Sequence, residues 1–272
     1  MSFEWQYISS KSNSLLVRIS KLKDKKYRKA EGLFRLDGIK LFCEAAEAGA
    51  PIECVFVALS VSEKYCRRVE EYSLNAKCYT VADEVFSKLT DELSPEGIVT
   101  VCRELDNIKK PESYAALAKK ALGGTVLLLA SVRDAGNMGT IIRSAKAFGI
   151  DNLIISSDCA DLYNSKTVRG AMGALFTQSI AVVDDVASAI TSLREGGFCV
   201  YGAALQRGAR KLGSFELKKT DAIVIGNEGH GLSDAEIAAC NECLYIPMEE
   251  GSESLNAGVA ASVCMWELYK TK

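Results

Sequence analysis

The stretch IPMEEGSESLNAGVAASV, residues 246–263, joins the end of an apolar strand to a short loop and then to a helix built mostly of small side chains. A helix with so few polar side chains is expected to be buried, and small side chains allow another backbone or a ligand to come close. Four polar residues could cap the start of this helix: Ser252, Glu253, Ser254 and Asn256. A helix start also presents free backbone N–H groups to a ligand. The stretch therefore predicts either a capped core helix or part of a ligand site, and the stretches before it decide between the two.

The composition is that of a globular protein. At 272 residues the chain can form one large or two ordinary domains, and 48% of its residues are hydrophobic and 25% charged. No apolar run approaches the roughly 20 residues that cross a bilayer. The first residues lack the basic and apolar regions of a signal peptide. These features predict a cytoplasmic protein without a membrane segment.

The chain contains ten cysteines and one histidine, His230. Most of the cysteines lie in apolar runs, where a free thiol packs as a small hydrophobic side chain, so they are expected to be reduced. Cys240 and Cys243 form a single C-x-x-C. Because a structural zinc site needs further ligands, no metal site is predicted.

The net charge of −2 conceals a basic region near the N-terminus. Residues 11–40 contain ten Lys or Arg against three Asp or Glu. An excess of one sign on this scale can bind phosphates, although a charged run can also be a solvated helix face. Both interpretations stay open from charge alone.

Two predicted domains follow from the order of the elements. Residues 1–104 alternate short strands and helices, which predicts a small α/β sandwich, and residues 105–124 are typical of a linker helix. In residues 125–272 apolar strands alternate with helical segments. The strands are expected at 125–130, 152–156, 179–183, 198–203 and 222–226. Such alternation indicates a parallel sheet that binds ligands beyond the carboxyl ends of its strands.

The loop after the first of these strands reads RDAGNMGTIIR, residues 133–143. It is a strand-to-helix turn with glycines, but it lacks the G-x-G-x-x-G spacing of a dinucleotide-binding loop. Asn137 lies near the helix start and Arg143 one to two turns later. Since the neighbours of Arg143 are apolar, its charge is expected to need a substrate or a partner carboxylate.

A second loop, GNEGHGLS at 226–233, follows an apolar strand. Its three glycines predict a sharply folded loop that lets a ligand approach the backbone closely. Ser233 is a candidate cap for the next helix. His230, between two glycines, is interpreted as a turn residue rather than a general base.

Taken in order, the motifs N-x-G-x-x-x-R, G-N-E-G-x-G-L and I-P-M-x-x-G-x-E-S-L-N-x-G-V-A-A-S resemble those of the SpoU, or TrmH-like, RNA ribose 2′-O-methyltransferases of the SPOUT superfamily. The N-terminal part is similar to the L30e-like substrate-binding domain that many members carry, on the stretches KKYR (25–28), LFRLDG (33–38) and SPEGIV (94–99). Asp37 and Glu96 stand where Glu and Gln are usual in that domain. Those departures concern the choice of RNA target rather than the reaction.

The resemblance implies an α/β fold in which the C-terminal parallel sheet carries a deep trefoil knot, beside a smaller L30e-like α/β sandwich. It implies S-adenosylmethionine as the cofactor and a homodimer formed through the knotted domain. Five residues are expected to bind the cofactor, mainly through the backbone: Leu205, Gly226, Ile246, Met248 and Leu255.

By the same resemblance, Arg143 would bind or activate the ribose 2′-hydroxyl. Asn137, Glu228, Ser254 and Asn256 would orient it and the loops, and Lys25, Lys26, Arg28 and Arg35 would bind RNA. The expected substrate is 23S ribosomal RNA. The alternatives are a transfer RNA 2′-O-methyltransferase and a non-catalytic RNA-binding protein of the same fold. A nicotinamide-dependent enzyme is disfavoured by the missing glycine spacing.

Overall fold

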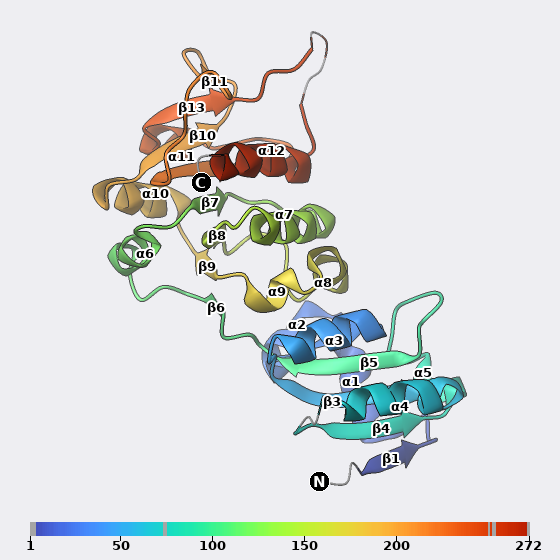
Figure 1. Cartoon of the computed structure of the whole chain (residues 1–272). Coiled ribbons are helices and arrows are strands. Elements are labelled where there is room, and N and C mark those ends of the chain that lie inside the picture. The colour runs from blue at the N-terminus through green and yellow to red at the C-terminus, as the bar shows by residue number, and fades with distance from the viewer. Residues whose placement is uncertain (1–3, 73–74, 250, 252–253, 271–272) are drawn as a thin grey trace. The chain divides into compact units, whose positions relative to one another are not determined.

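The computed structural model describes residues 4–72, 75–249, 251 and 254–270 (Figure 1). The chain divides into two compact units, which we treat separately. Unit 1 comprises residues 1–105 and 161–176, and unit 2 comprises residues 106–160 and 177–272.

Unit 1 is built on a mixed five-stranded sheet. Its strands, in spatial order, are β1 (Trp5–Ile8), β4 (Lys77–Val81), β3 (Ile52–Ala58), β5 (Ile98–Arg103) and β2 (Leu33–Asp37). The β1–β4 and β3–β4 pairs are parallel, whereas β5 runs antiparallel to β3 and β2. Side chains alternate across β3, so that Phe56 packs in one core and Val55 and Val57 in the other.

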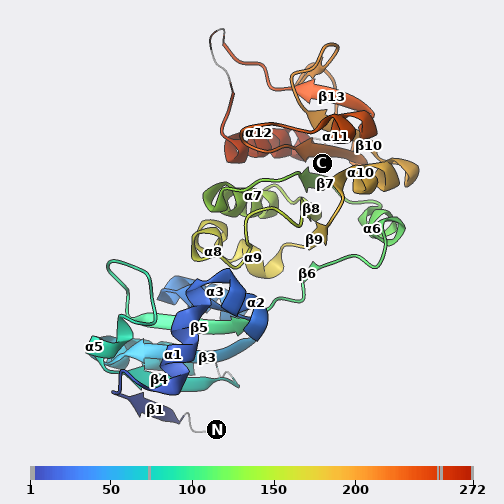
Figure 2. The ribbon, with the colours of Figure 1, turned by 180° about the vertical axis from the view of Figure 1, so that it is seen from behind.

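Helices cover both faces of this sheet. The elements of unit 1 are α1 (Ser14–Ser20), η1 (Lys21–Lys23), α2 (Lys25–Glu31), α3 (Ile39–Glu47), η2 (Leu59–Val61), α4 (Ser62–Glu70), α5 (Asp83–Phe86), α8 (Ser165–Ala171) and most of α9 (Ala174–Thr177). Helices α3 and α4 lie on the face seen in Figure 1, and α1 lies on the face seen in Figure 2. The predicted α/β sandwich is thus present, and it includes the edge strand β1, which the sequence did not predict.

Unit 2 contains an eight-stranded sheet in which every pairing is parallel. Its spatial order is β11 (Arg210–Lys211), β13 (Glu242–Tyr245), β10 (Cys199–Ala203), β12 (Asp221–Ile225), β7 (Val126–Leu129), β8 (Asn152–Ser156), β9 (Ile180–Val183) and β6 (Ile108–Lys109). The central strand β7 is fully buried, as its continuous apolar sequence predicts. The parallel sheet predicted from the sequence is confirmed.

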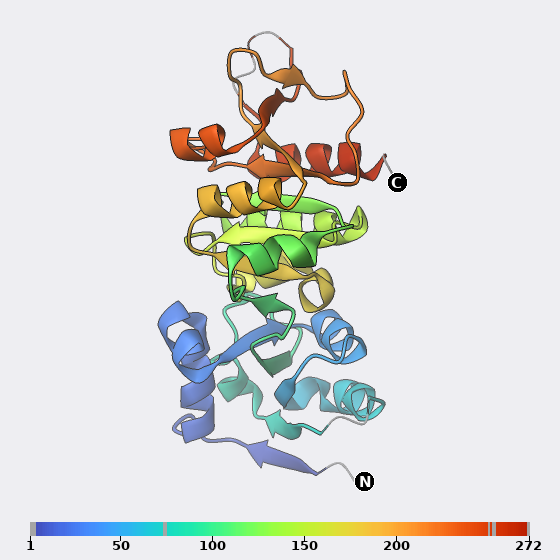
Figure 3. The same cartoon turned by 90° about the vertical axis from the view of Figure 1, so that its left-hand side faces the viewer.

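Two groups of helices pack on this sheet (Figure 3). One group consists of α6 (Tyr114–Ala121), α10 (Val186–Glu195) and α11 (Asp234–Ala239), and the other of α7 (Ala135–Ala147) and α12 (Ala257–Tyr269). Leu117, Ala118 and Ala121 of α6 belong to the core of unit 2. The helix expected as a linker therefore packs as part of the second unit. Residues 161–176 pack instead with unit 1, where Tyr163 stacks on Phe34 with ring centroids 4.4 Å apart.

Helix α12 begins as the opening stretch predicts. The side chain of Asn256 caps it by accepting hydrogen bonds from the backbone N–H groups of Gly258 at 2.9 Å and Val259 at 3.3 Å. The expected caps Ser252 and Glu253 lie outside the described residues, and Ser254 is exposed. The expected burial of the helix is only partial within a single chain: Ala257, Gly258, Ala261, Cys264, Met265 and Leu268 are buried, whereas Val259 is 49% exposed. No helix in the described part of the chain is both long and apolar enough to cross a membrane.

Candidate active site

The candidate site lies at the carboxyl edge of the parallel sheet in unit 2. Strands β13, β10, β12 and β7 are consecutive neighbours, and all point the same way. The loops that follow them therefore begin side by side (Figure 1). These loops carry the three sequence motifs, as well as Leu205 after β10.

A hydrogen-bonded triad joins the three motifs. The Asn137 side-chain amide donates to a carboxylate oxygen of Glu228 at 3.0 Å, and the Asn256 amide donates to the Asn137 carbonyl oxygen at 2.8 Å. Asn137 is 8% exposed, so both of its polar ends are satisfied inside the protein. Residues separated by more than 90 positions in sequence are thus brought together, as the order of the motifs predicts.

The loop after β7 donates several hydrogen bonds to the carboxylate of Glu228. Glu228 accepts hydrogen bonds from the backbone N–H groups of Arg133 at 3.2 Å and Asp134 at 3.1 Å, in addition to Asn137. Burial alone would raise the pKa of Glu228, but these hydrogen bonds outweigh it and hold the pKa below the usual value. Glu228 is therefore ionised at neutral pH, and its carboxylate connects the loop after β12 to the loop after β7.

The loop at 226–233 is folded as tightly as its glycines predict. Asn227 and Gly231 exchange backbone hydrogen bonds of 3.0 and 2.9 Å, which bring the ends of the loop together. A Cβ atom on Gly226 would lie 2.3 Å from the carbonyl carbon of Gly231. Only glycine therefore fits at residue 226 unless the loop moves. Ser233 caps α11 in a capping box with Glu236, and His230 is exposed.

Apolar side chains stand exposed around these loops. Leu205 is 83% exposed, Met248 42% and Leu255 38%, and Ile246 is half-buried. Leu205 follows β10, Ile246 and Met248 follow β13, and Leu255 immediately precedes Asn256. Gly226 follows β12. Exposed apolar groups beside loop backbone suit a ligand with a flat apolar ring and polar edges, such as the adenosyl part of S-adenosylmethionine.

Arg143 lies on the exposed side of α7, contrary to the crowded apolar setting that its sequence neighbours suggested. Ile141, Ile142 and Ala145 turn inward and are buried. Within the described residues, Arg143 forms no ion pair. The guanidinium is therefore free to bind a phosphate or a substrate oxygen.

Two of the four expected RNA-binding residues are exposed and two are not. Lys25 and Lys26 are exposed on α2. Arg28 is 6% exposed and binds the backbone oxygens of Leu22 and Lys23 and the Asp161 carboxylate, the last at 2.6 Å. Arg35 is 5% exposed and binds Asp91 and the backbone oxygen of Leu89. The expectation of RNA contact is therefore corrected for both arginines, because their guanidinium groups are used inside unit 1.

Arg28→Ala is expected to destabilise unit 1 by about 3 kcal/mol, because it leaves the Asp161 carboxylate and two carbonyl oxygens without their partner. Urea unfolding followed by Trp5 fluorescence measures this, in a Trp266→Phe background that removes the second of the two tryptophans. Lys25→Ala, on the same helix, should change the free energy of unfolding by less than about 0.5 kcal/mol. Equal effects of the two substitutions would contradict the structural role of Arg28.

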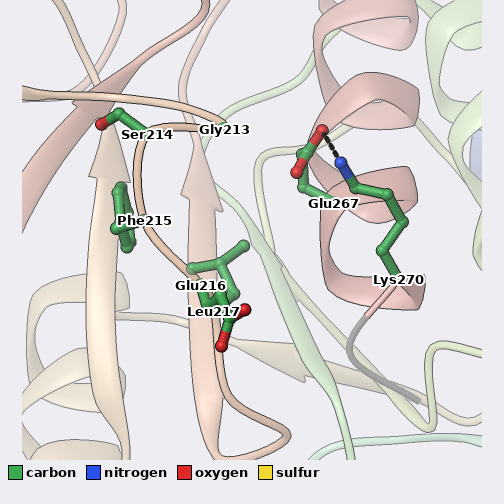
Figure 4. Close-up of a pocket in the computed structure, with 7 residues that line it drawn as sticks. All are labelled: Gly213, Ser214, Phe215, Glu216, Leu217, Glu267 and Lys270. Atoms are coloured by element: carbon green, nitrogen blue, oxygen red, sulfur yellow. Dashed lines mark ion pairs between the residues drawn. The ribbon is translucent and has the colours of Figure 1, made fainter.

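A pocket elsewhere in unit 2 is formed by other residues. A cavity of about 520 Å³ is lined by residues 213–217 together with Glu267 and Lys270, which form a 2.7 Å ion pair (Figure 4). It contains none of the predicted site residues. Among the residues that the structure describes, no group of three His, Cys, Asp or Glu side chains could hold a metal ion.

The fold and the site define an α/β enzyme that binds its ligand beyond the carboxyl ends of parallel strands. The chain belongs to the SpoU rRNA methylase family, whose family model matches residues 124–266. The model of the MRM3-like substrate binding domain matches residues 13–100. Membership of this family makes the protein an RNA methyltransferase that uses S-adenosylmethionine.

Relatives resemble the chain over nearly its full length. The Bacillus subtilis 23S rRNA (guanosine(2553)-2′-O)-methyltransferase RlmP is 32% identical over 261 residues, covering 96% of this chain and 98% of the relative. A putative RNA methyltransferase of the TrmH family from Porphyromonas gingivalis has a TM-score of 0.80 at 26% identity, over 96% of this chain and 99% of that one. The AdoMet-bound rRNA methyltransferase from Sinorhizobium meliloti has a TM-score of 0.80 at 25% identity, with 97% of each chain covered.

Proposed function

We propose that the protein methylates the ribose 2′-hydroxyl of a guanosine in 23S ribosomal RNA. The observation that carries this proposal is the triad of Asn137, Glu228 and Asn256, which joins the three family motifs at one edge of the sheet. RlmP of Bacillus subtilis, and RlmB of Coxiella burnetii at 28% identity over 200 residues, both carry names that specify a guanosine of 23S rRNA. A ribosomal RNA substrate agrees with the cytoplasmic location expected from the sequence.

S-adenosylmethionine, when bound, supplies an activated methyl group on sulfur. Leu205, Met248 and Leu255 have the exposure and position to cover its apolar parts, and Gly226 and Ile246 bring loop backbone to its polar edges. The protein then has to align the ribose oxygen and help it lose its proton.

We assign that task to Arg143. Its guanidinium would hold the ribose oxygen or the adjacent RNA phosphate and stabilise the negative charge that develops on the oxygen. A guanidinium stays protonated at working pH and cannot readily act as the base itself, so the proton of the hydroxyl passes to another group at the site or to water. Asn137, Glu228 and Asn256 would hold the loops, and the exposed Ser254 would contact the substrate.

The working unit is proposed to be a homodimer formed through α7 and α12. Helix α12 carries three large apolar side chains that are 45–49% exposed, namely Val259, Trp266 and Tyr269. Helix α7 packs beside it, with Ser144 and Ser262 hydrogen-bonded at 3.0 Å. A second copy would cover this apolar face. Since Arg143 lies on the exposed side of the same helix pair, we propose that it serves the partner's cofactor.

The C-terminal knot also belongs to the proposal. Gly258 faces α7, and a Cβ atom on it would make an ordinary contact with Thr140 at 3.4 Å. Ala257, Gly258 and Ala261 are buried. Small buried side chains of this kind suit a segment that passes through a loop and packs tightly against it, the arrangement expected of the family.

The proposed RNA surface consists of exposed lysines on η1 and α2: Lys21, Lys23, Lys25, Lys26 and Lys29. None of them forms an ion pair with another described residue. Replacing Lys25 and Lys26 with alanine should weaken RNA binding. The plot of the logarithm of the RNA association constant against the logarithm of the salt concentration should become less steep by about 1 to 2. The exposed pair Lys119 and Lys120 on α6 is the matched control. An equal loss in both double variants would argue against a specific surface.

The substrate is tested with RNA from cells that lack this protein, separated into 23S, 16S and transfer RNA. Purified protein and labelled S-adenosylmethionine should label one guanosine of 23S RNA, and position 2553 is the first to map. Labelling of transfer RNA instead would overturn the substrate. Cofactor binding without labelling of any fraction, assembly intermediates included, would favour the non-catalytic alternative.

A further inference from the structure

Ser131, directly after β7, has an unusual backbone conformation. Its φ of +55° lies in the left-handed region, where Met172 is the only other non-glycine residue in the described part of the chain. A residue with a Cβ atom is disfavoured there, so surrounding contacts must hold it in place. The sequence motifs do not include Ser131.

Three hydrogen bonds hold Ser131, and their partners lie at the ends of two neighbouring strands, β8 and β12. Its backbone N–H donates to the Ser156 hydroxyl at 2.8 Å, and its own hydroxyl donates to Asp158 at 2.7 Å. Its carbonyl oxygen accepts from the side chain of Asn227 at 2.7 Å. Ser156 ends β8, and Asn227 follows β12. One residue thus links the ends of β7, β8 and β12.

Asp158 is the common acceptor of three hydrogen bonds in this network. It accepts hydrogen bonds from the hydroxyl of Ser156 at 2.6 Å and from the guanidinium of Arg133 at 3.0 Å, in addition to Ser131. The Ser156 hydroxyl leads the groups that lower the pKa of Asp158 to about 2, so the carboxylate is charged at any working pH.

The chain that leaves Ser131 carries the groups of the active site. Two residues later, the backbone N–H groups of Arg133 and Asp134 reach Glu228, and Asn137 then connects Glu228 to Asn256. The left-handed conformation of Ser131 thus lies immediately before the stretch that makes these contacts. We propose that Ser131 and Asp158 are a positioning pair that sets the geometry of the methyl-transfer site without touching substrate or cofactor.

Kinetics of Ser131→Ala, Asp158→Asn and the double variant test the pair, at a temperature at which each protein is folded. The proposal rests on the methyl transfer proposed above, so each rate is compared with wild type in the same assay. Each single variant should lower kcat about 10- to 100-fold, because small displacements of reacting groups cost rate. The dissociation constants for S-adenosylmethionine and RNA should change less than about threefold, and the double variant should be no slower than the slower single variant.

Two further serine replacements separate the hydrogen bond from backbone strain. Ser131→Gly relieves the strain but cannot bond to Asp158, so it should be about as slow as Ser131→Ala. Ser131→Asn tolerates the left-handed region and can donate to Asp158, so it should recover much of the rate. Asp184→Asn removes an exposed ion pair, to Lys110, after the neighbouring strand β9 and is the control, with kcat within about threefold of wild type.

Hydrogen exchange of the Arg133 and Asp134 amides provides a readout that does not need activity. Exchange should be faster in Ser131→Ala and Asp158→Asn than in wild type, because the Arg133 and Asp134 amides would no longer be held against their acceptor Glu228. Unchanged exchange together with unchanged kcat would overturn the proposal, as would additive losses in the double variant. A wild-type protein that transfers no methyl group would contradict the proposed function, whereas the exchange result would still decide on the pair.

Discussion

Arg143→Ala is expected to lower the rate of methyl transfer about a thousandfold while the dissociation constant for S-adenosylmethionine changes less than threefold. Arg143 lies on the exposed side of α7 without an ion-pair partner among the described residues, so its removal should not disturb the fold. In the proposed reaction its guanidinium stabilises charge that develops only as the ribose oxygen reacts. Loss of such a donor typically costs about 100- to 1,000-fold in rate. Single-turnover transfer and calorimetric cofactor binding measure the two quantities.

Lys146→Ala is the matched control, since it removes another exposed positive charge from the same helix. It should leave transfer within about threefold of wild type. Arg143→Lys keeps the charge but not the forked donor geometry, and should recover only a small part of the rate. Unchanged turnover in Arg143→Ala would remove the assignment of Arg143.

The second large effect is expected for Gly226→Ala. The added methyl group would lie 2.3 Å from the carbonyl carbon of Gly231 and 2.6 Å from the backbone nitrogen of Leu232, so the loop must move. Overpacking against backbone costs about 1 to 3 kcal/mol. Because this loop belongs to the proposed cofactor site, S-adenosylmethionine should bind about 10- to 100-fold more weakly, as equilibrium dialysis can measure.

Gly229→Ala provides the control in the same loop. A Cβ atom there would meet nothing closer than the Asn227 side-chain oxygen at 3.6 Å, an ordinary contact. Cofactor affinity should therefore stay within about threefold of wild type. If Gly229→Ala and Gly226→Ala weakened binding equally, general loop flexibility would explain the effect, and the close packing at Gly226 would not.

Mixing the two variants, at a cofactor concentration too low to occupy the Gly226→Ala site, tests the assignment of Arg143 to the partner's site. A mixed dimer of Arg143→Ala and Gly226→Ala subunits has one site with an intact cofactor loop and an intact arginine, if the arginine acts across the dimer. Activity should then return on mixing. Absence of recovery in a proven mixed dimer would place Arg143 in its own subunit's site.

The sequence predicts the parallel sheet because its strands are continuous apolar runs, such as Val126–Leu129. It predicts the meeting of Asn137, Glu228 and Asn256 because parallel strands bring their carboxyl ends to one edge. The short strands β6 and β11, of two residues each, carry no such pattern and were missed. A strand of that length is defined by its neighbour rather than by its own side chains.

Side-chain environments were harder to predict than elements. Arg28 and Arg35 belong to a basic stretch that suggested RNA contact, yet Asp161 and Asp91, distant in sequence, bind them inside unit 1. Arg143 was expected among apolar side chains, but the helical repeat turns those neighbours inward and leaves the arginine outside. Ser131 had no sequence signal, because its role depends on three hydrogen bonds to other strand ends.

The most direct test of the central claim follows a deuterated methyl group. Purified protein is incubated with S-adenosylmethionine carrying a CD3 group and with 23S RNA from cells that lack the protein, and the RNA is digested to nucleosides for mass spectrometry. The account predicts the CD3 group on the ribose of 2′-O-methylguanosine, at one position, and its loss in the Arg143→Ala reaction. A CD3 group on a base, or no transfer to any RNA by a protein that binds the cofactor, would contradict it.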